Sequence, residues 1–419
     1  MSFSRFDIAI AGDSLAAQMA AALLAKQGRR VIRLTTAGHH DPWQHASLFL
    51  DKLLDTLGGQ ASRRANQPFQ VLAPRGRVTI QPEMPLVDEL TREFGSDSVP
   101  VIALLDHLEQ LGRLLEEVLW EHGGLPGGGV REAATWRWRC LRRKLPPVML
   151  SGSLTKRLQA MAEPAAEWLR DLFQGLALQP LAALTMADGA LLWAHARRPA
   201  GVADAELHQL LQQRFEQFHG VEISLASLAA LEHRDSLWSG TRHDGGTFQA
   251  GHLVLGDLDL ELPGRGFPLP HQPLTPPQNL VTSSLDGQLS PLLVERVIVG
   301  GPQPMRLAVT AATHGVVAHI SASVIADEAQ IRSQLEPVLP FARYTLEHLH
   351  HGRSSVRLAN PSSAALPIGK VPFRLGSHLW CADETRLLPQ LGSGGAALLG
   401  WTLVRQLDTS SQTRHRRGW

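Results

Sequence analysis

The stretch DIAIAGDSLAAQMAAALLAKQGRRVIRLTT, residues 7–36, decides the fold of this 419-residue chain. It opens with a short apolar run over residues 8–11 that Gly12 follows at once, a pattern typical of a buried strand that enters a tight turn. Residues 16–26 are rich in alanine and leucine, which favour a helix. Gly28 ends that helix, and an apolar run over residues 31–34 follows. The stretch therefore predicts a strand–helix–strand unit.

The turn after the first strand keeps part of the glycine pattern with which a Rossmann sheet binds a dinucleotide. That pattern, G-x-G-x-x-G, needs one glycine for the bend, one for close approach of the diphosphate and one for helix packing. Here the three positions hold Gly12, Ser14 and Ala17, and Thr35 replaces the acid that would bind a ribose. The helix start still offers backbone N–H groups, including that of Leu15, to an anion. The unit predicts a Rossmann-like fold with a weakened cofactor signature.

Composition describes a globular chain, 44% hydrophobic and 19% charged, that is long enough for two or three domains. A formal net charge of +1 gives no general attraction to nucleic acid. Cys140 and Cys381 lie far apart, which argues against a disulfide framework or a metal site. We see neither a signal peptide nor an apolar run near the roughly 18 residues that span a bilayer, so we expect a cytoplasmic location.

Apolar periodicity organises the rest of the chain into alternating helices and strands. The predicted helices cover residues 47–57, 84–94, 102–122, 154–176, 181–196, 203–218 and 326–350, the last with a break marked by Pro337 and Pro340. The predicted strands cover residues 70–72, 77–81, 221–225, 251–255, 292–299, 306–311 and 316–321.

Residues 135–144, TWRWRCLRRK, alternate Trp136, Trp138 and Cys140 with arginines. This alternation is the period of a strand that has one apolar and one basic face. A basic face could bind phosphate or a membrane surface. A solvated strand face or an arginine–carboxylate network would explain the same arginines without any ligand. We favour the second explanation, and peripheral membrane contact stays open.

The stretch LWCADETRLLPQLGSGGAALLGWTLVRQL, residues 379–407, indicates a family. Together with residues 7–34 it resembles the split FAD-binding domain of the flavin amine oxidase and phytoene desaturase superfamily. In that family a strand that ends in Gly-Asp or Gly-Glu lies beside the flavin, and a glycine-rich helix start follows. Here Ala382 and Asp383 stand at the first place, and residues 392–396 stand at the second.

The resemblance implies roles for individual residues. Asp383 would bond ribityl or phosphate-side groups of FAD, and the N–H groups near Gly394 would direct a helix dipole toward the flavin. The backbone that begins at Leu225 would lie near the adenine. The residues that the resemblance assigns to the cofactor are Gly12, Ser14, Leu15, Ala17, Thr35, Thr36, Leu225, Asp383, Gly394, Gly395 and Ala396.

The resemblance also implies an α/β fold, in which a Rossmann-like FAD-binding domain is split between the N- and C-termini and an α+β substrate domain is inserted. The first domain would comprise residues 1–60, 195–260 and 370–408. The substrate or cap domain would comprise residues 61–194 and 261–369. Residues 409–419 would form a basic tail.

Three functions compete. The resemblance implies an FAD-dependent oxidoreductase that removes hydride from an apolar or amine-bearing small molecule; the flavin accepts the hydride, and the sequence identifies no catalytic residue. The departures at the phosphate, ribose and pre-Asp383 positions favour an alternative, a catalytically inactive member that binds FAD weakly or not at all and acts as a binding or scaffold protein. Arg29, Arg30 and Arg33 would suit the 2′-phosphate of NADP, but that function leaves the C-terminal resemblance unexplained.

Overall fold

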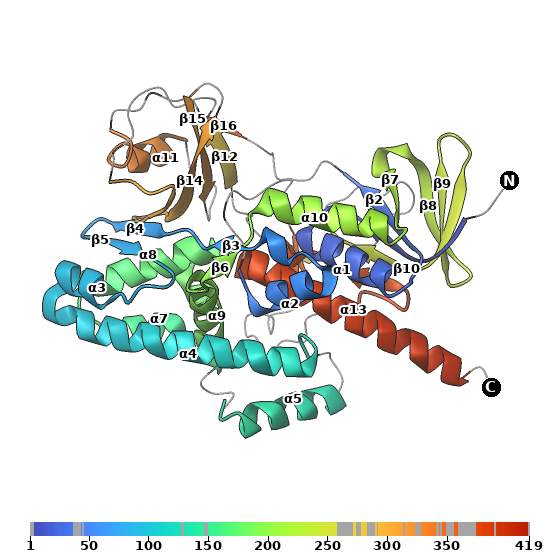
Figure 1. Ribbon diagram of the computed structural model, residues 1–419, viewed down its shortest axis with the longest axis horizontal. Helices are drawn as coiled ribbons and strands as arrows, with labels where there is room; N and C mark the ends of the chain where they lie inside the picture. Colours follow the sequence, from blue (N-terminus) through green and yellow to red (C-terminus); the bar gives the residue numbers. More distant parts are fainter. Residues whose placement is uncertain are drawn as a thin grey trace.

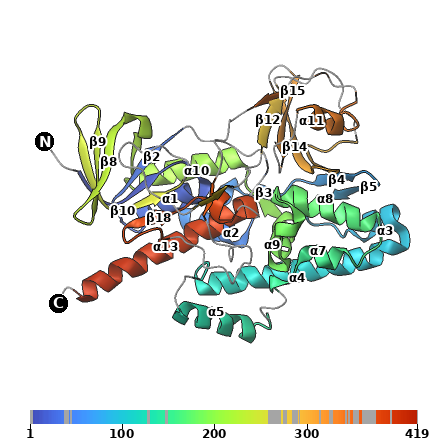
Figure 2. The same ribbon diagram turned by 180° about the vertical axis from the view of Figure 1, so that it is seen from behind.

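Two large β-sheets, two short strand pairs and the helices packed around them make up the described part of the chain (Figure 1). The computed structural model describes residues 4–36, 43, 46–126, 130–145, 150–257, 271–273, 278–282, 290, 292–312, 315–322, 328–340, 343, 346–348, 356–358, 374–388 and 391–417. The first sheet lies toward one end of the molecule and the second toward the other, in both views (Figures 1 and 2).

The first sheet combines strands from the beginning, the middle and the end of the chain. Its order is β7-β2-β1-β10-β9-β8, and β18 pairs with the end of β10. The strands are β1 (Ser4–Ala11), β2 (Val31–Thr35), β7 (Val221–Ser224), β8 (Leu228–Arg234), β9 (Leu237–Arg242), β10 (Thr247–Leu255) and β18 (Leu379–Cys381). All pairs among β7, β2, β1, β10 and β18 are parallel. The predicted fold class, a Rossmann-like sheet shared by both chain ends, is confirmed.

Alanine-rich α1 (Leu15–Lys26) is buried along nearly its whole length because other helices pack against it. Its neighbours are α2 (Leu48–Leu57), α10 (Asp204–Gln217) and α13 (Gly392–Arg417). Small side chains allow this close approach: a Cβ added to Gly400 of α13 would lie 3.0 Å from the Cβ of Met19. The helix composition read from the sequence therefore reflects packing as well as helix propensity.

The second sheet follows the order β16-β12-β15-β14-β13-β4-β5. Its strands are β4 (Phe69–Ala73), β5 (Gly76–Ile80), β12 (Gln278–Thr282), β13 (Arg296–Val299), β14 (Met305–Ala312), β15 (Gly315–Ala322) and β16 (Leu346–His348). Two short pairs stand apart: β3 (Arg64–Ala65) with β6 (Ala200–Gly201), and β11 (His271–Pro273) with β17 (Val356–Leu358). The predicted hairpin after residue 69 is confirmed by the antiparallel β4–β5 pair.

The remaining helices are α3 (Val87–Phe94), α4 (Ser98–His122), α5 (Val130–Arg142), α7 (Leu154–Leu158), α8 (Ala165–Ala177), α9 (Met186–Ala196), α11 (Glu328–Leu335) and α12 (Glu384–Leu387). Most of them lie beside the second sheet or between the sheets, α5 lies on the far side of α4 (Figure 1), and α12 contacts α13. The long α4 packs closely on α9, because a Cβ on Gly112 would lie 2.1 Å from the carbonyl oxygen of Ala190. These two helices carry Glu116 and His195, which bond each other beside the pocket described below.

Three predictions of secondary structure differ from the structure. The helix predicted over residues 154–176 is two helices, α7 and α8, with residues 159–164 between them. The stretch 135–144 lies mostly in helix α5, not in a strand: Trp136 and Cys140 are four residues apart and buried, while Trp138 is exposed. An alternating pattern this short is compatible with the period of a strand and with that of a helix. The predicted helix over 326–350 is α11 followed by strand β16, because Pro337 and Pro340 cannot continue a helix.

The described residues contain no helix that is both long and apolar enough to cross a membrane. Nor do they contain a group of three histidine, cysteine or acidic side chains that could hold a metal ion. Neither Cys140 nor Cys381 forms a disulfide, and both are buried. Burial raises the pKa of the Cys140 thiol to about 11, so this thiol stays protonated and unreactive at neutral pH.

Candidate cofactor edge and ligand pocket

The carboxyl ends of the parallel strands bring the N- and C-terminal motifs together. Gly12, which follows β1, has a φ of +102°, a conformation that glycine adopts without strain. The N–H of Gly256 donates to Ala11 O over 2.6 Å, and the N–H of Ala382 donates to Leu255 O over 2.7 Å. Ligands of open α/β sheets bind at such an edge, so this is where a cofactor is expected.

Ser14 links the first turn to the C-terminal strand. Its Oγ accepts a hydrogen bond from the N–H of Ala17 (3.2 Å) and thereby caps α1. The same hydroxyl donates to the carbonyl oxygen of Ala382 over 2.8 Å. The side chain that replaces the second glycine thus bridges the two segments between which a dinucleotide would pass.

Glu384 places its carboxylate on the N-terminus of α1. Its two oxygens accept the N–H groups of Leu15 (3.0 Å) and Ala16 (3.4 Å). These are the free donors at a helix start that otherwise attract an external anion. Burial raises the pKa of Glu384 to about 7, and the neighbouring Asp383 carboxylate adds to the rise. A carboxylate of the chain itself therefore occupies the anion position.

Asp13 spans from the first turn to the end of β2. Its carboxylate accepts from the Arg33 guanidinium (2.9 Å), from the Thr36 hydroxyl (2.9 Å) and from the Thr36 N–H. Arg33 is buried, and its guanidinium lies 5.5 Å from the centre of the Phe215 ring. Arg33 is thus enclosed, which disfavours the NADP function. The adjacent Thr35 hydroxyl donates to Ile223 O over 3.4 Å.

The other predicted cofactor residues lie in three places. Asp383 is buried at the start of α12. Leu225 begins a short 3₁₀ turn after β7, next to Ser224, which pairs with Thr35. Gly394, Gly395 and Ala396 lie in the first turn of α13. A Cβ on Gly394 would lie 2.2 Å from Nδ1 of His195, so this glycine packs against a side chain of α9. Assignment of these residues to a cofactor stays a prediction.

His195 belongs to a buried charge network that the sequence did not predict. Glu116 of α4 is 1% exposed and bonds His195 (3.1 Å), Arg198 (2.6 Å) and the N–H of Leu48 (2.7 Å). Burial raises the pKa of Glu116, but the hydrogen bond and charge of His195, together with Arg198, outweigh it and hold the pKa at about 2. One feature of the sequence could have indicated this network: Glu116 follows Leu115 on the apolar face of the helix predicted over residues 102–122.

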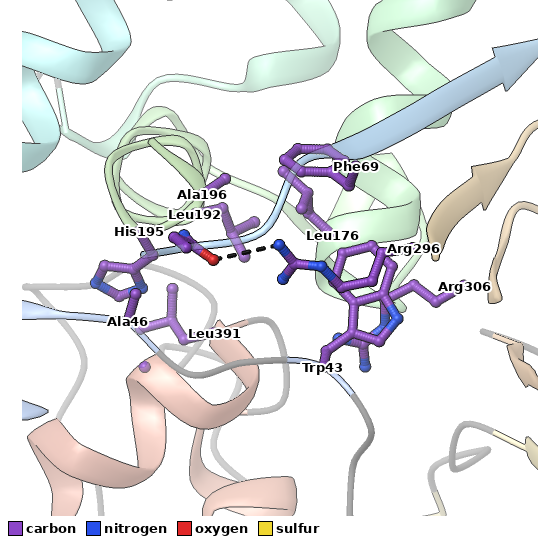
Figure 3. A pocket seen from close by; sticks show the side chains of 12 residues that line it. Trp43, Ala46, Phe69, Leu176, Leu192, His195, Ala196, Arg296, Arg306 and Leu391 are labelled. Atoms are coloured by element: carbon purple, nitrogen blue, oxygen red, sulfur yellow. Dashed lines mark hydrogen bonds between the residues drawn. The ribbon is translucent and has the colours of Figure 1, made fainter. Parts of the chain in front are cut away.

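A pocket of about 80 Å³ lies beside His195 (Figure 3). Trp43, Arg296 and Arg306 lie at one end of it, and His195 lies at the other. The guanidinium carbons of Arg296 and Arg306 lie 5.5 Å and 5.3 Å from the centre of the Trp43 ring. Its lining residues are Trp43, Ala46, Asn66, Phe69, Leu176, Leu192, His195, Ala196, Arg296, Arg306, Leu391 and Gly394. Apart from Gly394, the sequence analysis assigned none of them, because they come from distant segments that share no motif.

The strand edge does not fit the diphosphate of FAD. The N–H groups that would bind it are bonded to Glu384, and the Ser14 hydroxyl is bonded to Ala382 O over 2.8 Å, so these groups are already engaged within the chain. The carboxyl groups of Asp383 and Glu384 follow each other in the chain, and the charge of Asp383 contributes to the raised pKa of Glu384; a diphosphate at this helix start would add further negative charge.

Comparison with solved structures shows the fold. A double mutant of putrescine oxidase, from a redesign of its cofactor binding, matches with a TM-score of 0.58 and 12% identity over 97% of this chain and 100% of that chain. Cyclohexylamine oxidase from Brevibacterium oxydans IH-35A matches with a TM-score of 0.57 and 11% identity over 98% and 99%. No family model and no curated protein sequence matches the chain. The resemblance to amine oxidases therefore holds at the level of the fold.

Proposed function

We propose that this chain is a flavin-free protein with the amine oxidase fold, which binds a small molecule and carries out no FAD-dependent oxidation. The observation that carries the proposal is the Glu384 carboxylate on the N–H groups of Leu15 and Ala16. A helix start can neutralise one anionic group at a time. The chain uses its own carboxylate there, so a diphosphate would have to displace it.

Two further contacts support the proposal. The Ser14 hydroxyl holds the first turn to Ala382, and Asp13 closes the path toward the end of β2 through its bonds to Thr36. Each contact would have to break for a dinucleotide to lie along this edge. Loss of the glycine at position 14 and of the acid at position 35 is then consistent with a site that no longer selects a nucleotide.

The second candidate is an FAD-dependent oxidoreductase that acts on an apolar or amine-bearing small molecule. The likeness of nearly the whole chain to two amine-oxidising enzymes supports it. It requires Glu384 to leave the helix start. The pKa of about 7 would let this side chain become neutral near physiological pH, which would reduce its repulsion of a diphosphate.

Visible absorbance after gel filtration, with and without added FAD, separates the two candidates. We expect the wild-type protein to emerge colourless under both conditions. The double variant Ser14→Gly/Glu384→Ala opens the helix start and should retain more FAD than the wild type. Glu206→Ala is the matched control, because Glu206 also lies in the first turn of a helix but pairs with Arg64.

A flavin spectrum that survives gel filtration of the wild-type protein would contradict the flavin-free proposal and favour the oxidoreductase. Failure of the double variant to gain any FAD would mean that more than these two side chains excludes it. Thr35→Glu, which restores the ribose acid, would then be added to the double variant.

A further inference from the structure

Helix α5 lies at the edge of the molecule, outside α4, in both views (Figures 1 and 2). Trp136 and Cys140, four residues apart on one face of it, are buried. The Trp136 ring contacts the His122 ring of α4 edge to face, with the ring centroids 5.5 Å apart. Because these contacts hold one face of α5 against the protein, the opposite face is turned outward.

The outward face carries a continuous row of exposed apolar side chains. Residues three or four apart on a helix share a face, and four apolar residues follow this spacing along α5: Val130, Ala134, Trp138 and Leu141. All four are exposed, Trp138 by 66% and Leu141 by 60%. We call this row the α5 stripe. Exposed apolar side chains that adjoin one another mark a surface that binds a partner or a membrane.

Basic side chains flank the α5 stripe. At 3.6 residues per turn, Arg131 and Arg142 lie along one side of the stripe and Arg137 lies along the other, while Lys144 follows the end of the helix. All four side chains are exposed. The acidic residue of α5, Glu132, lies on the side away from the stripe, where its carboxylate accepts from an arginine of α13 over 2.8 Å. The outward face of α5 is therefore apolar along its middle and basic along its edges.

Two other arginines of the same segment turn toward α4. Arg143 bonds the carboxylate of Glu121, and Arg139 donates to the carbonyl oxygen of Glu121. The hydrogen bond from Arg143, with the charges of the nearby arginines, lowers the pKa of the Glu121 carboxyl. The arginine–carboxylate network that the sequence favoured is thus present at Arg139 and Arg143. It does not account for the exposed arginines beside the α5 stripe.

An amphipathic helix with an apolar stripe and basic flanks is typical of a helix that lies in the plane of a membrane interface. Tryptophan is enriched at the level of the lipid headgroups, and arginine can cover apolar surface with its stem while its charged end stays in water. A nucleic acid would bind the arginines but leave Val130 and Leu141 in water. A second copy of this chain would bring two basic flanks together, and like charges repel.

We propose that α5 docks the protein on an anionic membrane surface. Trp138 and Leu141 insert at the boundary between headgroups and acyl chains, and the basic flanks bind the lipid phosphates. This contact is peripheral, because only one face of a surface helix takes part. The inference goes beyond the proposed function and does not depend on it, since it uses none of the residues of the strand edge or of the pocket.

The test is co-sedimentation of the full chain with vesicles of phosphatidylcholine alone or of equal parts phosphatidylcholine and phosphatidylserine. The wild type should sediment with the anionic vesicles, stay in solution with the neutral ones and be released by high salt. Trp138→Ala/Leu141→Ala should weaken binding to the anionic vesicles about tenfold or more, because the inserted apolar area is lost. Arg137→Gln/Arg142→Gln should weaken it about 25-fold, at about fivefold for each basic residue.

Two double variants outside α5 are the matched controls. Val99→Ala/Leu292→Ala removes apolar side chains that are equally exposed, by 67% and 65%. Arg92→Gln/Arg234→Gln removes the same charge from exposed arginines of α3 and β8. Both should bind the anionic vesicles nearly as the wild type does. Trp138→Phe should also keep most of the binding, because phenylalanine is an apolar aromatic, but it should lose most of the quenching of tryptophan fluorescence by brominated lipid.

Three results with vesicles would overturn the proposal: no sedimentation of the wild type with anionic vesicles, equally tight binding to neutral vesicles, or unchanged binding of Trp138→Ala/Leu141→Ala. Weaker binding in the arginine variant alone would belong to the third case and would indicate a polyanionic partner such as a nucleic acid. A wild-type dimer in gel filtration that Leu141→Ala converts to a monomer would assign the α5 stripe to a second copy of the chain, and would overturn the proposal as well.

Discussion

Glu384 combines two opposing effects in one side chain. The N–H groups of Leu15 and Ala16 stabilise its charged form, as does the positive end of the α1 dipole. Burial and the adjacent Asp383 act against that form, and the net result is a pKa near 7. Glu384 therefore lowers the stability of the folded protein once the pH is high enough to ionise it.

Replacement of Glu384 by glutamine should make the stability of the protein less sensitive to pH. The folded-state pKa lies above the ordinary value of 4.5, so its contribution to stability is fully present below pH 4.5 and is lost as the pH rises through about 7. Between pH 4.5 and 8 the wild type should lose at most about 3 kcal/mol relative to Glu384→Gln. Urea denaturation of both proteins at pH 5 and pH 8 measures this difference.

A second buried carboxyl group, that of Asp171, does not disturb that comparison. Burial also raises its pKa to about 7, but it is present in both proteins and its effect cancels. Parallel stability curves for the wild type and Glu384→Gln across this range would contradict the assignment of a raised pKa to Glu384.

At the scale of elements, apolar periodicity predicted most of the helices, and capping signals marked the ends of some of them. Ser47 and Gly58 bound α2 as a side-chain cap and a left-handed glycine, and both could be read from the sequence. The contact of Glu384 with Leu15 joins residues 369 positions apart, and no pattern in the sequence indicates it. Likewise, Trp43 meets the arginines of β13 and β14 only through the tertiary fold.

The close contact between α4 and α9 predicts a large effect of a small substitution. Gly112→Val should destabilise the protein by about 1–3 kcal/mol or more, because the new side chain would overlap the carbonyl oxygen of Ala190, 2.1 Å from an added Cβ. Ala103→Val on the exposed face of the same helix is the control and should change stability by only a few tenths of a kcal/mol. Thermal unfolding followed by circular dichroism compares the two, and equal effects would contradict the packing argument.

At the scale of the whole molecule, the chain retains the fold of amine oxidases over 97–98% of its length, while the strand edge of its first sheet is closed by its own side chains. The Rossmann-like topology depends on buried strands and on the alanine-rich α1, which the altered positions leave intact. Under the proposed function, fold and cofactor binding are separable in this chain, since Ser14 and Glu384 make bonds within the chain where a ligand would bind.

This separation predicts that FAD has no effect on the stability of the folded protein. A ligand that binds only the folded state stabilises it by about 2.7 kcal/mol at a concentration of 100 times its Kd, which raises the melting temperature by roughly a few degrees in a protein of this size. We expect the wild-type melting temperature to stay constant as FAD is titrated, while Ser14→Gly/Glu384→Ala shows a rise that depends on FAD concentration. A concentration-dependent rise in the wild type would mean that the diphosphate displaces Glu384 from the helix start, and the closed edge would then be a resting state of a flavoprotein.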